Sequence, residues 1–263
     1  MVPTFNRKVL TDRAVESVTP SDPDKFEILV VDDQGDPPYG FSGDRNSSGV
    51  EVRVLRTRSN GGPGLARKLG VQEASSDVIA FLDSDDVFDS NWPDSLLAEV
   101  VRSSAAEREQ LFIVGDAVNG SRINRKFAQL LPLLPHGLQM TGARLSAILC
   151  NPFYAQATAV SKRLCVFADD LRYCEDYLTN VMALFSAGKF VALRQTACIM
   201  NRSPGTSGGL SARQREMLAG EFRVRIMTLR SGSIPVFYRM LVPLGMLYQG
   251  IRAMLKNVVG LGR

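Results

Sequence analysis

The segment from Val78 to Asp86 is the feature that most constrains how this chain folds. It begins with the apolar run VIAFL, and three carboxylates follow within four positions, at Asp83, Asp85 and Asp86. A buried strand that ends in acids places them at the sheet edge where α/β proteins bind ligands. Closely spaced carboxylates repel one another unless a cation lies among them, and hard divalent cations prefer oxygen ligands. The pattern predicts a cation and phosphate site, with a solvated acidic turn as the alternative.

Strand and helix patterns alternate along the first half of the chain, which predicts an α/β fold with a doubly wound, mostly parallel sheet. The expected strands are 26–31, 50–54, 78–82, 110–114, 156–160 and 190–200. The expected helices are 8–18, 64–75, 92–107, 176–186 and 211–229. A second strand also ends in acids, at Asp32 and Asp33. We therefore expect two acidic strand ends to meet at one edge of the sheet.

Basic residues are concentrated toward the C-terminus. The 263-residue chain has a net charge of +4, but residues 201–263 contain ten Lys and Arg against two acids. Nucleic acid, anionic lipid and a phosphorylated substrate are all suitable partners for such a region. Leu, Val, Met and Ile lie between its bases, which favours a membrane surface and argues against nucleic acid.

The apolar segment 234–259 contains prolines and charges, so we do not expect it to span a bilayer. On a helix with about 100° per residue, its polar residues share an arc of roughly 140°. These are Arg239, Gln249, Arg252, Lys256 and Asn257. The pattern predicts a C-terminal amphipathic helix at a membrane interface. A helix packed on the protein's own core is the alternative.

The four cysteines form no CxxC pair, and His136 is the single histidine. A zinc site is therefore not expected, and reduced thiols indicate a cytoplasmic protein.

Five short motifs follow one another in the order found in a known family. They are PTFNR at 3–7, VVDD at 30–33, NGGPGLARKLG at 60–70, FLDSDD at 81–86 and the acidic pair Glu175–Asp176. Together with Arg202 and the Gly/Ser-rich segment that follows it, they resemble family 2 glycosyltransferases, the inverting nucleotide-sugar enzymes with the GT-A fold. The resemblance runs from Pro3 to about Ser211.

The resemblance implies a metal-dependent enzyme that moves a sugar from a nucleoside diphosphate donor, UDP-linked, to a glycan or lipid-linked acceptor in cell-surface polysaccharide synthesis. It assigns a divalent cation, Mn²⁺ or Mg²⁺, to Asp85 with Asp83 and Asp86. The residues that it assigns to the donor nucleotide are Pro3, Thr4, Asn6, Asp32, Asp33, Arg67, Asp83 and Arg202. For Arg67, a structural salt bridge with Asp83 is an equal alternative.

Asp176 is the catalytic base that the resemblance implies. A base has to be ionised and to reach the acceptor hydroxyl, and a helix start keeps a carboxylate ionised. A plain helix cap is the alternative role, and Asp169–Asp170 is a nearby competitor for the base.

The resemblance implies a catalytic domain over 1–211, and residues 212–263 are expected to form a basic helical tail at the inner face of the cell membrane. A nucleotidyltransferase acting on a sugar phosphate is one alternative, but it would carry a Gly-rich basic loop where this chain has TFNR. An inactive membrane-bound binding module is the other, and the intact acids Asp83, Asp85 and Asp176 argue against it.

The expected first strand is short, because only Met1 and Val2 precede Pro3. The first strand of a doubly wound sheet lies centrally, between the strands expected at 26–31 and 78–82. Each buried backbone group left unpaired there would cost about 1–3 kcal/mol. We expect either another segment in this place or a natural chain that begins upstream of Met1, and we favour the second.

Overall fold

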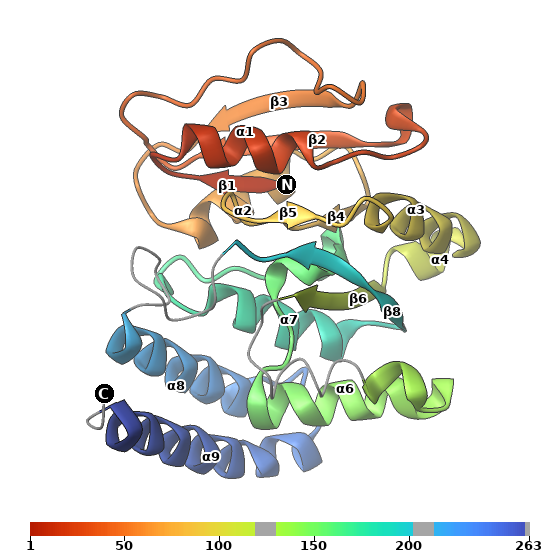
Figure 1. Cartoon of the computed structure of the whole chain (residues 1–263). Helices are drawn as coiled ribbons and strands as arrows, with labels where there is room; N and C mark the ends of the chain where they lie inside the picture. The colour runs from red at the N-terminus through yellow and green to blue at the C-terminus, as the bar shows by residue number, and fades with distance from the viewer. Residues whose placement is uncertain (119–129, 202–212, 261–263) are drawn as a thin grey trace.

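The structure is a computed structural model that describes residues 1–118, 130–201 and 213–260. Figure 1 shows a small sheet at the top, a larger sheet in the middle and a layer of helices at the bottom. The small sheet is parallel, with strand order β1–β2–β3. Its strands are β1 Val2–Thr4, β2 Glu27–Asp32 and β3 Glu51–Arg56. The residues of β2 from Ile28 onward are buried, as expected for an apolar central strand.

The larger sheet has five strands in the order β4–β7–β6–β8–β5. They are β4 Val78–Ala80, β5 Val87–Phe88, β6 Leu111–Val118, β7 Thr158–Ser161 and β8 Lys189–Ile199. Only β6 and β8 pair in parallel; β4 and β6 run antiparallel to β7, and β5 runs antiparallel to β8. The expected α/β class is confirmed, with parallel pairing in the first sheet and mixed pairing in the second.

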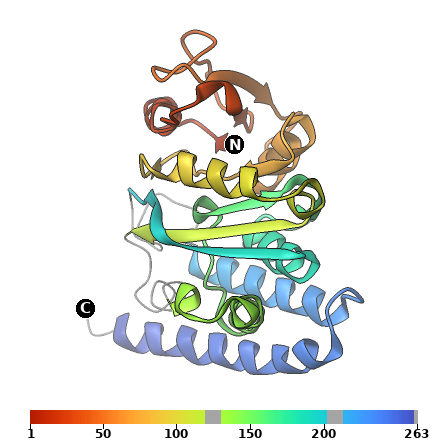
Figure 2. The ribbon, with the colours of Figure 1, turned by 90° about the vertical axis from the view of Figure 1, so that its right-hand side faces the viewer.

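Helices pack around and below the two sheets. They are α1 Lys8–Glu16, α2 Pro63–Glu73, α3 Trp92–Arg102, α4 Ala105–Arg108, α6 His136–Cys150, α7 Glu175–Ser186, α8 Gln214–Arg230 and α9 Val236–Gly260. Short 3-10 turns occupy Pro23–Lys25, Leu131–Leu133, Ala155–Ala157 and Lys162–Leu164. Figure 2 shows α6, α8 and α9 together below the larger sheet.

The sequence predicted one helix over 92–107, but the structure has two. Ser103 is extended, and Ser104 begins α4 with a capping box in which its hydroxyl accepts from the Glu107 N–H and the Glu107 carboxylate accepts from the Ser104 N–H. A capping box favours the start of a new helix over the continuation of an old one. Helix α6 was not predicted.

Two hydrophobic clusters form the core. One lies between the larger sheet and the helices below it, and the other lies among α1, α3 and both sheets. Trp92 is fully buried in the second cluster. Its ring lies so close to β6 that a Cβ at Gly115 would come within 2.7 Å of it, so glycine is required there. Within the described ranges, no helix is long and apolar enough to cross a membrane.

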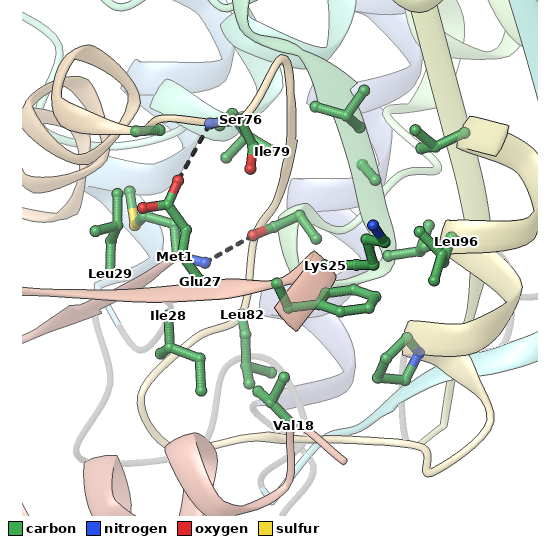
Figure 3. A pocket seen from close by; sticks show the side chains of 18 of the residues that line it. Met1, Val18, Lys25, Glu27, Ile28, Leu29, Ser76, Ile79, Leu82 and Leu96 are labelled. Atoms are coloured by element: carbon green, nitrogen blue, oxygen red, sulfur yellow. Dashed lines mark hydrogen bonds between the residues drawn. The ribbon is translucent and has the colours of Figure 1, made fainter. Parts of the chain in front are cut away.

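The chain's first residues occupy the place between β2 and β4 at the carboxyl end of the sheet. Residues 2–4 pair with β2, while the Met1 amino group donates to the Ala80 carbonyl at 2.9 Å and the Leu82 N–H donates to the Met1 carbonyl at 3.1 Å. A cavity of about 310 Å³ lies next to Met1. Figure 3 shows side chains that line it, with Met1 among Ile28, Ile79 and their neighbours. Burial lowers the pKa of the Met1 amino group to about 5. The central place is therefore filled at this edge, and the expected upstream start stays a prediction.

Candidate active site

A cavity of about 740 Å³ lies where β1, β2 and β4 end. Its walls come from the loops after these strands, from the start of α2 and from the segments that lead into α7 and α8. The predicted site residues that line it are Pro3, Thr4, Asp33, Arg67, Asp83, Asp85 and Asp176. The chain thus brings residues from positions 3 to 176 into one place, as expected from the carboxyl edge of a doubly wound sheet.

Arg67 connects the two halves of this cavity. Its side chain is 6% exposed and donates to Asp83 Oδ1 at 2.5 Å and to the Glu175 carboxylate. Burial lowers the pKa of Arg67, but the charges of Asp83 and Glu175 outweigh burial and hold the pKa above its usual range. The salt bridge that was the alternative role for Arg67 is therefore present, and it joins α2 and α7 to the acidic loop after β4.

Asp176 lies in the first turn of α7 and is partly exposed to the cavity. Burial raises the pKa of its carboxyl group. The nearby Arg67 guanidinium opposes that rise, as does the hydrogen bond that the carboxylate accepts from the Tyr177 N–H. The geometry gives Asp176 access to a bound hydroxyl, while its role as the base stays a prediction.

The competing acids Asp169 and Asp170 lie outside the cavity lining. Asp169 accepts from Lys68 Nζ at 2.6 Å, and Asp170 pairs with Arg223. Their carboxylates are about 70% exposed. This placement favours Asp176 over the pair as the base.

The three acids after β4 do not share one environment. Asp83 and Asp85 line the cavity, and Asp85 Oδ2 accepts from Arg7 Nη1 at 2.8 Å. Asp86 is buried, and its oxygens accept from Gln156 Nε2 at 3.1 Å and from the Asn201 N–H at 2.9 Å. Burial, with the charge of Asp83, raises the pKa of Asp86 to about 7. The oxygens of Asp86 are thus turned into the protein, which does not favour it as a direct metal ligand, and that role stays a prediction.

Two carboxylates on one wall of a solvent-accessible cavity fit a hard divalent cation. Across residues 1–118, 130–201 and 213–260, no group of three acidic, histidine or cysteine side chains is arranged as a complete metal cage. A cation held by Asp83 and Asp85 would therefore take its remaining ligands from water and from substrate phosphate, as Mg²⁺ commonly does.

The acids at the end of β2 also differ from each other. Asp32 is 1% exposed and lies outside the cavity lining. Its carboxylate accepts from the Gly35 N–H at 2.8 Å, from the Tyr39 N–H at 3.2 Å and from Arg56 Nη1 at 3.0 Å. This arrangement therefore does not favour a direct contact of Asp32 with the nucleotide. Asp32 instead holds the loop after β2 in place.

Asp33 lines the cavity and fixes its glycine-rich wall. Its carboxylate accepts from the Gly61 and Gly62 N–H groups at 3.1 and 2.6 Å and from Thr57 Oγ1 at 3.0 Å. Gly62 has φ +86, a conformation that favours glycine. The VVDD and NGG motifs thus build one wall together.

One predicted donor contact, Asn6, lies elsewhere. Asn6 is exposed with φ +53, and its side-chain oxygen accepts from the Asp36 N–H at 2.7 Å, outside the cavity lining. Arg202 falls outside the residues that the structure describes. Sequence reasoning gave no role to Arg7, Glu175, Arg172, Tyr173, Arg213 and Met217, which also line the cavity. Arg7 and Glu175 could have been predicted, because each belongs to one of the family motifs. The other four residues lie outside the motifs, and the sequence gives no signal for them.

Comparisons with known proteins find a family match in the first part of the chain. Residues 1–115 match the family model described as glycosyl transferase family 2. The succinoglycan biosynthesis protein ExoW of Rhizobium meliloti is 40% identical over 89 residues, which are 32% of this chain and 27% of the relative. The poly(ribitol-phosphate) beta-N-acetylglucosaminyltransferase TarS of Staphylococcus aureus is 26% identical over 212 residues, 75% of this chain and 34% of TarS. A GalNAc(5)-diNAcBac-PP-undecaprenol beta-1,3-glucosyltransferase of Campylobacter jejuni is 34% identical over 88 residues, 33% of this chain and 28% of the relative. The matches thus span about a third or less of these relatives.

Solved structures show the same fold over nearly the whole chain. S. aureus TarS 1–349 in complex with UDP-GlcNAc superposes with a TM-score of 0.64 at 15% identity, covering 94% of this chain and 70% of that one. The mannosyltransferase PcManGT of Pyrobaculum calidifontis, in complex with GDP-Man and Mn²⁺, gives 0.60 at 13% identity, covering 98% and 74%. The family motifs, the match of residues 1–115 to the family model and the GT-A fold of these neighbours agree: the chain has the GT-A fold, and its first 115 residues resemble glycosyl transferase family 2.

Proposed function

We propose that this chain is an inverting glycosyltransferase that uses a nucleoside diphosphate sugar and a divalent cation. The observation that carries the proposal is the shared cavity, in which Asp83 and Asp85 lie on one wall and Asp176 lies on another. A pair of acids that holds a cation for the diphosphate and a separate base for the hydroxyl are two parts that glycosyl transfer requires. A nucleotidyltransferase has no need of the base.

The residues divide the chemistry among them. Asp83 and Asp85 would hold Mn²⁺ or Mg²⁺, which when bound neutralises charge on the leaving diphosphate. Thr4 and Asp33 would contact the nucleoside from the β1 and β2 edge. Asp176 removes the proton from the acceptor hydroxyl while that oxygen attacks the anomeric carbon opposite the leaving group. Attack from the opposite side inverts the configuration at that carbon.

We further propose a UDP-linked donor and a glycan or lipid-linked acceptor in cell-surface polysaccharide synthesis. The donor class is supported by TarS, which has been solved with UDP and with UDP-GlcNAc. The acceptor class is supported by the names of relatives that act on poly(ribitol-phosphate) and on a PP-undecaprenol-linked glycan.

A panel of nucleotide sugars with Mn²⁺ tests this function through release of the nucleoside diphosphate. We expect release with a UDP-sugar. Asp176→Asn should lower the transfer rate at least about 100-fold, the lower end of a general base's contribution, while UDP binding is retained. Asp170→Asn is the matched control and should transfer at the wild-type rate. Pyrophosphate release from a nucleoside triphosphate and a sugar phosphate would instead favour the nucleotidyltransferase, and no release of either kind would favour the binding module.

Helix α9 carries the proposed membrane contact. Large apolar side chains along it are 49–71% exposed: Phe237, Met240, Leu244, Leu247, Ile251 and Met254. Their spacing of three and four residues places them on one stripe of the helix. Val242 and Gln249, at 1% and 3% exposure, face the protein on the opposite side. The helix therefore packs on the core, which was the alternative expectation, and it also presents an apolar stripe outward, so that contact with a membrane stays a prediction.

We propose that this stripe lies on an anionic membrane at its cytoplasmic face, with residues 1–211 as the catalytic domain and 212–263 as the membrane-contacting tail. The sequence of α9 has Arg239, Arg252 and Lys256 and no acid, which suits anionic lipid better than a coiled-coil partner. Co-sedimentation with phosphatidylglycerol vesicles tests this.

The double variant Leu244→Glu/Leu247→Glu should remain soluble where the wild type sediments. Both sites are exposed, so folding is retained, whereas deletion of the tail would remove the buried Ile234 and Val242. Val101→Glu on α3, where Val101 is 69% exposed, is the control and should sediment normally. Equal sedimentation of all three proteins, or none with the wild type, would disprove the contact.

A further inference from the structure

We propose that Arg213, with Arg172 in the same cavity, binds a phosphate of the acceptor, so that this chain selects acceptors phosphorylated next to the sugar that receives the new residue. The inference rests on the proposed function and names the acceptor class for the same cavity. It comes from the charges on the cavity wall near Asp176.

Both arginines come from segments near the base. Arg172 and Tyr173 precede α7, whose first turn holds Asp176, and Arg213 directly precedes α8. All four residues line the same cavity. Both arginines are exposed, so an incoming ligand can reach them.

The partners of these two arginines are neutral. Arg213 Nη1 lies 3.3 Å from Tyr173 Oη, and Arg172 Nη2 donates to Asn60 Oδ1 at 3.0 Å. By contrast, Arg67 is paired with Asp83 and Glu175, and Arg7 with Asp85. In the part of the chain that the structure describes, neither Arg172 nor Arg213 has a carboxylate within 4.0 Å.

Asp83, Asp85 and Glu175 in the same cavity are already paired with Arg7 and Arg67, so the charges of the two exposed guanidinium groups are available to an anion. Guanidinium groups bind phosphate through paired N–H donors, and such charge-assisted hydrogen bonds are stronger than neutral ones. A phosphate is therefore the ligand that best fits the pair. Tyr173 and Met217 line the same wall and offer apolar surface beside it.

The position of Arg213 assigns the phosphate to the acceptor. The donor diphosphate has to approach Asp83 and Asp85, if these acids hold its cation, on the wall that follows β4. Arg213 instead contacts Tyr173, three residues before Asp176, and Asp176 acts on the acceptor hydroxyl. Arg172 contacts Asn60, on the side of the cavity that we assign to the nucleoside, whereas Arg213 contacts Tyr173 near the base. Arg213 is therefore the arginine whose position favours the acceptor over the donor.

Calorimetry on UDP-saturated protein tests the subsite without turnover. The probes are farnesyl diphosphate and ribitol 5-phosphate, with farnesol and ribitol as their neutral counterparts. We expect the phosphorylated probes to bind and the neutral ones to bind at least tenfold more weakly. Tighter binding of farnesyl diphosphate would identify a lipid-linked acceptor, and tighter binding of ribitol 5-phosphate a phosphate-containing polymer; either result supports the subsite.

Arg213→Gln should weaken phosphate binding by about 10- to 100-fold, the range of a hydrogen bond to a charged group. Arg213→Lys should restore part of it, because the charge is kept. Arg215→Gln is the matched control: it is exposed, two residues along, and outside the cavity lining. In all three variants the UDP affinity should stay within about twofold of the wild type, because the arginine contacts no donor group.

Equal binding of charged and neutral probes would overturn the proposal. A tenfold loss of UDP affinity in Arg213→Gln would also overturn it, since the arginine would then hold the donor diphosphate. If phosphate binding behaves as expected but no nucleotide sugar is turned over, the subsite stands and the proposed function fails.

Discussion

Replacing Arg67 by methionine should strongly destabilise the protein. Methionine keeps apolar volume but removes the cation that serves Glu175 and Asp83. Breaking a buried ion pair by removing one partner costs about 3–5 kcal/mol. The Glu175 side chain is 6% exposed and bears most of this cost, whereas Asp83, at 33%, regains solvent. We expect a loss of about 3 kcal/mol, from a domain stability of about 5–15 kcal/mol.

The loss should depend on pH in a defined direction. Burial raises the pKa of Glu175, and Arg67 opposes that rise. A folded carboxyl group with a raised pKa keeps its proton after the unfolded chain has lost it, so stability falls as pH rises from about 4.3 to the folded pKa. Without Arg67 the folded pKa is higher still, and the fall extends to higher pH. The deficit of Arg67→Met should therefore be larger at pH 8 than at pH 6.

Urea unfolding at both pH values, followed by circular dichroism with EDTA present, measures these free energies. The double variant Arg67→Met/Glu175→Gln should regain more than about 1 kcal/mol over Arg67→Met, because the buried charge is gone. Arg223→Met, which breaks an exposed pair with Asp170, is the control and should cost less than about 1 kcal/mol. A loss below 1 kcal/mol for Arg67→Met, or an equal deficit at both pH values, would refute the reasoning.

Three further predictions concern the metal, the base and the helical layer. Asp85→Asn should weaken Mn²⁺ binding, measured by calorimetry, at least about tenfold, as expected for lost metal contacts. Asp86→Asn should bind Mn²⁺ more nearly as the wild type does, because the Asp86 oxygens face Gln156 and Asn201. The reverse order of the two variants would contradict the ligand assignment. As pH is lowered, kcat for transfer should fall with a midpoint above about pH 3.9, the ordinary Asp pKa, because burial raises the pKa of Asp176. A kcat profile with a lower midpoint would exclude Asp176 as the base. Arg225→Met should lower the free energy of unfolding by about 1–3 kcal/mol. The reason is that the buried guanidinium donates to the Ile148 and Leu149 carbonyls at the end of α6. A urea midpoint equal to that of the wild type would show that these carbonyls find other donors.

The sequence was sufficient to predict the alternating elements that carry the motifs. Runs such as residues 26–31 are apolar and bounded by polar residues, and the strand observed there is Glu27–Asp32. Helix α6 was missed, although it packs against α7 and α9 in the helical layer. Its sequence, HGLQMTGARLSAILC, contains two glycines and no strongly polar stripe, so that its helical state depends on tertiary packing. The antiparallel pairing in the larger sheet also could not be predicted from the sequence pattern, because the burial and length of an apolar run do not indicate the direction of the strand.

Neighbouring acids were the main limit for the candidate site. The sequence treated Asp32 with Asp33, and Asp85 with Asp86, as equivalent pairs. In each pair one carboxylate lines the cavity and the other is turned inward to hydrogen-bond donors. The inward partners, such as the Gly35 N–H and Gln156, are supplied by other segments that a local motif does not include. A motif therefore locates the acids, and only the tertiary structure separates those that can meet a ligand.

In the pair Glu175–Asp176 both residues line the cavity, but their carboxylates have different partners, with a consequence for mechanism. Successive residues of a helix point about 100° apart, so two adjacent acids in the first turn of α7 cannot both face Arg67. Glu175 pairs with the guanidinium and its side chain is 6% exposed, so that it is less accessible to a substrate proton than Asp176. Asp176 stays partly exposed in the cavity, near enough to Arg67 for its charge to favour ionisation. The buried acid thus positions the cation that keeps the second acid ionised, which is a physical reason for the base to be the second residue of the pair.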